Sequence, residues 1–171
     1  SSFEYFEKIV QVYAKLIDEI AKLDENITLQ IEEPIFVTDR IKEFKNLIEP
    51  TFNSLHKANI ETFVVTYFDR ANEAVEELVK TKIKGIGLDF ISSKQNLDAV
   101  ETVAKSDKLL IAGVVDGKNI WKINYEDLLA LLNEIATRIK KEKIIVATSC
   151  SLLHLPYSLE DETKLDSEVR S

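Results

Sequence analysis

The sequence is poor in the residues that mark several classes of protein. Its 171 residues include one Cys, four Gly, three Pro and no Met. One Cys excludes a disulfide-rich scaffold, and so few Gly and Pro exclude a collagen-like or low-complexity chain. The sequence also lacks the run of about eighteen apolar residues that a membrane-spanning helix needs. Because no Met stands at its start, we expect an internal or trimmed part of a longer polypeptide.

Basic residues are outnumbered by acidic ones. The chain has 22 Lys and Arg against 30 Asp and Glu, a net charge of −8. Nucleic-acid binding needs clustered basic side chains that displace counterions, so the sequence predicts no nucleic-acid partner. The 45% hydrophobic content is enough to build a core in a chain of this length. The single Cys150 and the absence of a signal-peptide pattern predict a cytoplasmic protein with no membrane partner.

Apolar residues at steps of three and four predict an amphipathic helix over residues 3–23, with one buried face. After it, short apolar runs alternate with helical patterns. The predicted strands are 27–31, 62–68, 85–90, 108–115 and 144–149, and the later helices are 40–58, 71–80, 96–104 and 125–141, with the start of another in 160–171. This alternation predicts an α/β fold, a parallel sheet of right-handed βαβ units whose strands are covered on both faces.

Two features favour a barrel over an open, doubly wound sheet. The turn after Ile31 has no glycine, whereas a nucleotide-binding open sheet normally has a Gly-rich turn there. Polar residues also follow every predicted strand, as at the mouth of a barrel: Glu32, Glu33, Tyr67, Asp69, Asp89, Asp116, Asn119, Ser149, Cys150, Ser151 and His154. A whole (β/α)8 TIM barrel needs roughly 250 residues and eight strands, so we predict its C-terminal part, with about five strands.

Five strings along the chain carry a resemblance to a known family. They are Gln30–Pro34, Thr66–Phe68, Gly87–Phe90, Ala112–Trp121 and Thr148–His154, with a related tail in 162–169. In order and spacing they are similar to the N-terminal barrel of cobalamin-independent methionine synthase. The resemblance implies that residues 1–171 are a partial N-terminal barrel domain, from about its third helix through its eighth strand.

In that family the full enzyme resembles two related barrels joined face to face. It moves the methyl group of a 5-methyltetrahydropteroyl-polyglutamate to homocysteine, and a zinc ion held in the C-terminal barrel activates the homocysteine thiol. The resemblance implies that this chain is a structural half at the folate cleft, inactive alone. Its implied partners are the remaining strands of its own barrel and the C-terminal catalytic barrel, with the folate and homocysteine as substrates of the parent enzyme.

No zinc is expected in this chain. The resemblance places Cys150 where a zinc-binding Cys would lie and Asp89 where a Glu would lie, while Val65 and Tyr67 stand on the strand that would carry the His and the other Cys. Zinc needs four converging ligands, so Cys150 and Asp89 are at most the remains of a metal site. No catalytic or cofactor-binding residue is predicted.

Glu32 and Glu33 are adjacent carboxylates at a strand end. Neighbouring strand residues point to opposite faces, so the pair cannot share one substrate proton. By likeness to the catalytic barrel, Glu32 points into the barrel mouth, and we expect it to accept hydrogen bonds from neighbouring loops.

His154 follows Cys150 by four residues, a spacing that suggests a Cys-His nucleophile. We favour instead a histidine that is hydrogen-bonded within a loop.

Asp116 and Asn119 belong to a tight Asp-Gly turn that lacks the later acidic positions of a calcium loop. Asn119, Trp121 and Lys122 are expected to fix the corner between strand and helix, with Trp121 packed, and His56 is expected to be solvated.

Two other functions stay open. One is a small βα enzyme that uses Glu32, Asp89, Asp116 and His154, and the other is a binding or assembly module that pairs through open strand edges.

Overall fold

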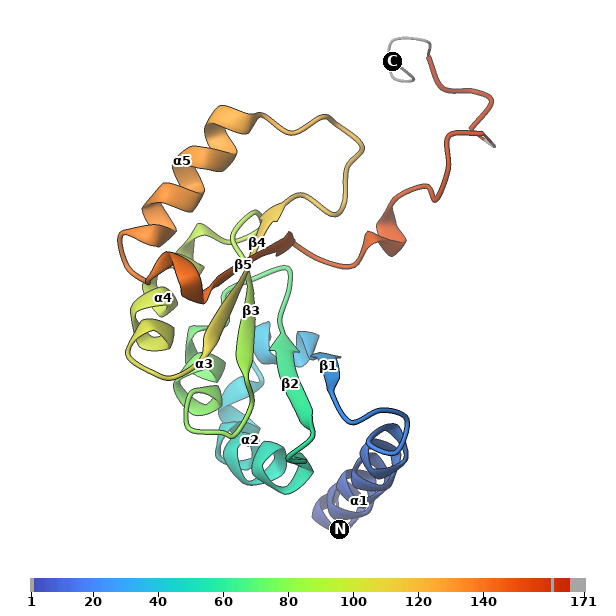
Figure 1. Ribbon diagram of the computed structural model, residues 1–171, viewed down its shortest axis with the longest axis vertical. Helices are drawn as coiled ribbons and strands as arrows, with labels where there is room; N and C mark the ends of the chain where they lie inside the picture. The colour runs from blue at the N-terminus through green and yellow to red at the C-terminus, as the bar shows by residue number, and fades with distance from the viewer. Residues whose placement is uncertain (1, 161, 167–171) are drawn as a thin grey trace.

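The computed structural model describes residues 2–160 and 162–166 of the chain, in which α-helices and β-strands alternate (Figure 1). The helices are α1 (Ser2–Ile20), α2 (Ile41–Leu55), α3 (Asn72–Leu78), α4 (Leu97–Ala104) and α5 (Tyr125–Ala136). The strands are β1 (Ile27–Glu32), β2 (Ile60–Val65), β3 (Gly85–Asp89), β4 (Leu109–Val115) and β5 (Ile144–Thr148). The short 3-10 helices are η1 (Pro34–Val37), η2 (Lys94–Asn96), η3 (Lys141–Lys143) and η4 (Leu152–His154).

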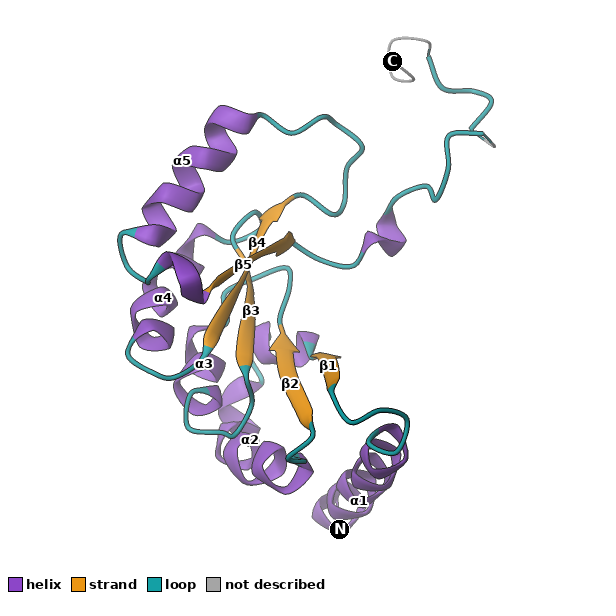
Figure 2. Ribbon diagram, in the orientation of Figure 1, coloured by secondary structure: helices purple, strands orange, loops and turns teal. Residues whose placement is uncertain are grey.

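The strands form one parallel sheet in the order β1-β2-β3-β4-β5. Figure 2 shows the sheet curled, with α2, α3, α4 and α5 along its outer face. The predicted α/β fold is therefore confirmed as a curled half-barrel of five parallel strands. None of the described helices is long and apolar enough to cross a lipid bilayer.

The main hydrophobic core lies between the sheet and the outer helices. Val64, Ile86 and Leu110 from the three central strands are fully buried there. Burying an aliphatic side chain of this size contributes roughly 1.5–3 kcal/mol, so these strands anchor the fold. A second cluster covers the inner face of the sheet and consists of Phe63, Val65, Tyr67, Ile111 and Cys150.

Glycines on β3 make room for the inner cluster. A Cβ atom on Gly87 would lie 2.7 Å from Cγ1 of Val65, and one on Gly85 would lie 2.7 Å from the Phe63 ring. Both distances are shorter than real carbon–carbon contacts. The two glycines therefore let the larger side chains of β2 lie flat over the neighbouring strand.

Most element boundaries differ from the sequence prediction by a few residues, and three differences are informative. Strand β2 ends at Val65 instead of residue 68, because Phe68 adopts a left-handed backbone with φ of 74° that turns the chain. Helix α5 ends at Ala136, where the Thr137 hydroxyl donates to the carbonyl of Glu134 at 2.7 Å. The helix expected in 160–171 is not formed in the described residues 162–166, and the rest of that prediction lies outside the described residues.

Helix α1 departs from the expectation of one buried face. Ile17 is buried and packs with Leu55 and Ile60, whereas Ile9 and Leu16 are 55% and 53% exposed. The helix contacts α2, but the described chain provides nothing that covers its outer apolar side. Half of the apolar pattern that predicted this helix thus lies on an open surface.

Candidate site at the carboxyl ends of the strands

Asp89, at the end of β3, organises the mouth of the half-barrel. Its carboxylate is fully buried and accepts backbone N–H bonds from Phe68 at 2.9 Å, Ile91 at 2.9 Å and Ser92 at 2.8 Å. One of these bonds holds Phe68 in its left-handed conformation, which is costly for a residue with a side chain. Asp89 therefore links the ends of β2 and β3.

Asn96 completes this link from η2. It is fully buried, and its side-chain amide donates to the carbonyl of Asp89 at 2.8 Å and to that of Asp69 at 3.2 Å. Its side-chain oxygen accepts from the backbone of Ala71 at 2.9 Å. Asn96 is not among the residues predicted from the sequence, although a polar side chain at the start of an apolar helix is a signal that can identify such a residue.

The turn after β4 is fixed by its own side chains. Asp116 accepts from the backbone N–H of Lys118 at 2.8 Å and from the side-chain amide of Asn119. Asn119 in turn accepts from the backbone of Trp121 at 3.0 Å, so Asn119 fixes the corner as predicted, and the same role for Lys122 stays a prediction. The Trp121 side chain is 70% exposed, so the expectation that it packs is wrong.

His154 lies beside Phe68. The two rings meet edge to face with centroids 5.9 Å apart, and the Nζ of Lys118 lies 5.4 Å from the Phe68 centroid on the same ring. No hydrogen bond to the His154 side chain occurs in the described part of the chain, so the predicted loop hydrogen bond is replaced by this ring contact. Phe68 and Lys118 gave no signal in the sequence, because the turn that exposes Phe68 depends on Asp89.

Cys150 is buried on the inner face, and burial is the main cause that raises the pKa of its thiol. Gly117 lies against it, since a Cβ atom there would be 2.8 Å from the Cys150 carbonyl oxygen. The oxygens of Asp89 are already bound by three N–H groups. No three His, Cys, Asp or Glu side chains among the described residues are grouped to hold a metal, whereas zinc takes four converging ligands.

Glu32 lies on the inner face of β1, is exposed, and accepts from the side chain of Gln30 at 3.1 Å. Tyr67, on the neighbouring strand end, is 7% exposed, and its hydroxyl has no hydrogen-bond partner in the described chain. Burial first and the nearby Glu32 carboxylate second raise the pKa of Tyr67. Asp89 and His154 both contact Phe68, but in the described chain no hydrogen bond or ion pair joins any two of Glu32, Asp89, Asp116 and His154, and no three of these side chains are grouped.

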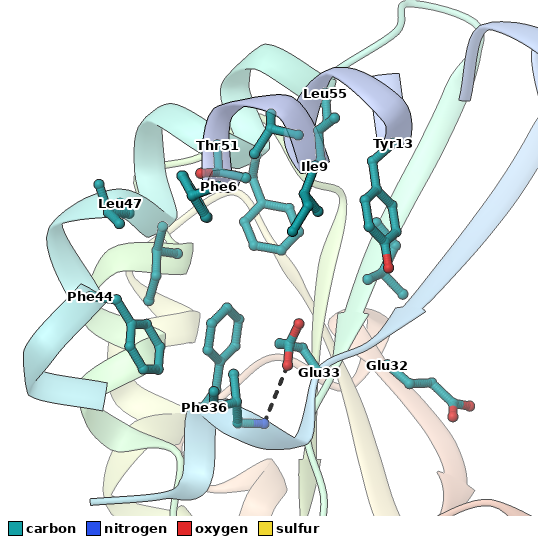
Figure 3. Close-up of a pocket in the computed structure, with 15 residues that line it drawn as sticks. Phe6, Ile9, Tyr13, Glu32, Glu33, Phe36, Phe44, Leu47, Thr51 and Leu55 are labelled. Atoms are coloured by element: carbon teal, nitrogen blue, oxygen red, sulfur yellow. Dashed lines mark hydrogen bonds between the residues drawn. The ribbon is translucent and has the colours of Figure 1, made fainter. Parts of the chain in front are cut away.

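Glu33 points the opposite way, as expected for adjacent strand residues, and enters a groove on the outer side of β1 (Figure 3). The groove has a volume of about 460 Å³ and is lined by apolar and aromatic residues of α1, α2 and η1. The Glu33 carboxylate accepts from the backbone N–H of Ile35 at 3.3 Å and so caps η1. His56, just after α2, is exposed as predicted.

Comparisons with known proteins agree with this geometry. The family model described as cobalamin-independent synthase, N-terminal domain, matches residues 1–140. The chain is 43% identical over 172 residues to a 5-methyltetrahydropteroyltriglutamate–homocysteine methyltransferase of Desulforamulus reducens, covering 99% of this chain and 22% of the relative. It is 36% identical to the protein of the same name from Bacillus mycoides, over 95% of this chain and 22% of that relative. The chain thus spans 22% of the length of these curated relatives.

The fold is also similar to a solved B12-independent methionine synthase from Shewanella sp. W3-18-1, in complex with selenomethionine. The TM-score is 0.69 with 18% sequence identity, over 85% of this chain and 48% of that chain. At this identity the likeness supports the half-barrel fold alone.

Proposed function

This chain belongs to the cobalamin-independent synthase family through its N-terminal domain, and we propose on that premise that it is part of a methyltransferase that makes methionine. The proposed reaction breaks the bond between the methyl group and nitrogen 5 of a 5-methyltetrahydropteroyl-polyglutamate. A new bond forms to the sulfur of homocysteine, and the thiol proton ends on the released folate. The observation that carries the proposal is the 43% identity to the D. reducens methyltransferase over 99% of this chain.

In this proposal the described residues are structural and do not react. The chain supplies the part of the N-terminal barrel from its third helix through its eighth strand and shapes the edge of the folate cleft. The buried bonds of Asp89 and Asn96 support that role, because they fix the loops at the mouth. Glu32, Asp116, Asn119 and His154 remain candidates for the rim of the cleft.

Zinc, as the Lewis acid for the homocysteine thiol, is placed in the C-terminal barrel of the parent enzyme and outside this chain. The donor set supports that placement, since Asp89 already accepts three backbone hydrogen bonds and no three His, Cys, Asp or Glu side chains are grouped among the described residues. The proposed partners are accordingly the remaining strands of the same barrel and the catalytic barrel, in the cytoplasm.

A chimera tests the proposal. The segment of the D. reducens methyltransferase that aligns with this chain is replaced by residues 1–171, and methyl transfer to homocysteine is measured. We expect activity within about tenfold of the unmodified enzyme, a loss of about 1.4 kcal/mol at most. The isolated chain is expected to show no methyl transfer and no stoichiometric zinc. A soluble but inactive chimera, or turnover by the isolated chain, would contradict the proposal.

An assembly module without catalysis is the second candidate function. It is favoured by the open edges of β1 and β5 in the described sheet, since unpaired strand edges pair readily with another chain. The mass of the isolated chain in solution distinguishes the two roles. A stable dimer would favour assembly, and a monomer would count against it.

A further inference from the structure

Phe68 is a strained residue whose ring lies outside the core. Its backbone has a φ of 74°, a left-handed conformation that costs free energy for any residue with a Cβ atom. Its ring lies 5.6 Å from that of Tyr67 between centroids, yet the side chain is 43% exposed and belongs to none of the buried clusters of the described chain. Core packing therefore does not offset the strain, and strained residues of this kind gather at binding and catalytic positions.

The loops after four consecutive strands meet at this ring. Phe68 follows β2, Ser92 follows β3, Lys118 follows β4 and His154 follows β5. The Nζ of Lys118 lies 5.4 Å from the Phe68 centroid and donates to the hydroxyl of Ser92 at 3.2 Å. The ring of His154 meets that of Phe68 edge to face at 5.9 Å. Parallel α/β sheets bind ligands at the carboxyl ends of their strands, so the exposed ring lies where a ligand is expected.

Lys118 supplies a positive charge beside the ring. Its side chain is exposed, and no carboxylate of the described chain forms an ion pair with it. Asp116 and Asp89 lie in the same loops, but both already accept hydrogen bonds from backbone N–H groups, and Asp116 also accepts from the amide of Asn119. The ammonium group is therefore available to a ligand. A flat ligand with a carboxylate suits this pair, because its ring can stack on Phe68 while its carboxylate binds Lys118.

We propose that Phe68, Lys118 and His154 form a subsite for a planar aromatic ring that carries a carboxylate-bearing group. Under the proposed function, on which this choice of ligand rests, the matching part of the substrate is the 4-aminobenzoyl-glutamate unit of the folate. Phe68 provides the stacking surface, Lys118 binds the carboxylate, and His154 holds the Phe68 ring in place. Asp89 is a positioning residue, because it accepts the N–H of Phe68 at 2.9 Å and so keeps the ring exposed.

The test measures the binding of three small probes to the 171-residue chain. 4-Aminobenzoyl-L-glutamate has the ring and the carboxylates, 4-aminobenzamide has the ring alone, and L-glutamate has the carboxylates alone. Binding is followed by two-dimensional NMR of the backbone amides at up to about 10 mM probe. We expect the complete probe to shift the amides of Phe68 and Lys118 with a Kd of about 1 mM, about 3–10 times tighter than either part. Binding no tighter than that of L-glutamate would overturn the inference.

Lys118→Gln separates the charge from the ring. Gln keeps a polar side chain and loses the charge, so we expect the complete probe to bind only about as tightly as 4-aminobenzamide. Lys122→Gln makes the same charge change four residues later in the exposed part of the turn and should leave the preference for the complete probe intact. A preference that survives Lys118→Gln would show that Lys118 does not bind the carboxylate.

Phe68→Gly separates a binding role from a structural one. Glycine adopts the left-handed conformation without a steric cost and keeps the N–H that Asp89 binds. We therefore expect the urea midpoint to fall by no more than about 0.5 M or to rise, while both aromatic probes bind about 3–10 times more weakly. A larger fall in the midpoint would show that the ring is needed for folding, and unchanged binding would show that it is no stacking surface. Either result would overturn the inference.

Failure of this inference and failure of the proposed function are distinguishable. Binding of the probes requires no methyl transfer, so an inactive chimera would refute the proposed function and leave the binding result standing. An active chimera together with a chain that does not bind the complete probe would refute the subsite alone.

Discussion

The centre of the sheet and its two edges have different surroundings. Every residue of β3 is buried, and β2 and β4 are almost as completely covered, whereas β1 is half-exposed and β5 has no fully buried residue. The edges also differ from each other. The open inner face of β1 is polar, with Thr28 and Gln30, but β5 exposes Ile145 and Val146. The centre therefore supports the fold, and the edges are surfaces on which further polypeptide can pack.

The largest effect is expected from Gly113→Val, at the centre of β4. A Cβ atom there would lie 2.9 Å from the Cα of Ser149 and 3.0 Å from the carbonyl oxygens of Leu88 and Thr148. Backbone atoms on both neighbouring strands cannot move aside cheaply, so we expect a loss of about 3 kcal/mol in the free energy of unfolding, measured with urea. Hydrogen exchange should show faster exchange of β5 amides while β1 is little changed. Equal loss of protection at both edges would contradict this separation of centre and edge.

A somewhat smaller loss is expected from Asp89→Asn. The side-chain amide retains one acceptor oxygen and places an NH2 group near the N–H of Phe68 or of Ile91 and Ser92. Hydrogen bonds to a charged group contribute roughly 1.5–3 kcal/mol, so we expect about 2 kcal/mol of destabilisation in urea unfolding. Asp116→Asn, in a half-buried turn one strand away, is the control and should cost less than about 1 kcal/mol. Comparable losses in the two variants would show that burial at the mouth does not decide the effect.

The next smaller effect is expected in how the free energy of unfolding depends on pH through the Cys150 thiol. Its pKa is raised by burial above the ordinary value of 9.0, so the folded chain favours the neutral thiol. That stabilisation is complete below the pKa of the unfolded chain and is lost as the pH rises through the folded pKa. We expect the free energy of unfolding to fall above pH 9.0 more steeply in the unmodified chain than in Cys150→Ala. Parallel curves would indicate that the thiol is accessible to water in the folded state.

How much of this comparison the sequence predicts depends on how local each signal is. The strands and the parallel order follow from short apolar runs, and the opposite directions of Glu32 and Glu33 follow from strand geometry. The contacts at the mouth of the half-barrel do not follow from any local sequence pattern. Asn96 and Phe68 owe their positions to bonds across 7 to 27 residues of sequence, which no local pattern encodes. The exposure of Trp121 and of half of α1 was missed for the same reason, since periodicity shows that a face is apolar and does not show what covers it.

We expect the smallest effect on stability from Val146→Lys on β5. This variant also distinguishes the β5 edge of the sheet from the β1 edge. Val146 is 54% exposed, so the substitution should change the free energy of unfolding by less than about 0.5 kcal/mol. A lysine on an edge strand opposes pairing with another chain, so any self-association of the isolated chain should weaken, as measured by sedimentation. Thr28→Lys adds the same charge to the polar face of β1 and should leave self-association unchanged. If Thr28→Lys is the variant that weakens it, β1 rather than β5 is the edge that pairs in solution.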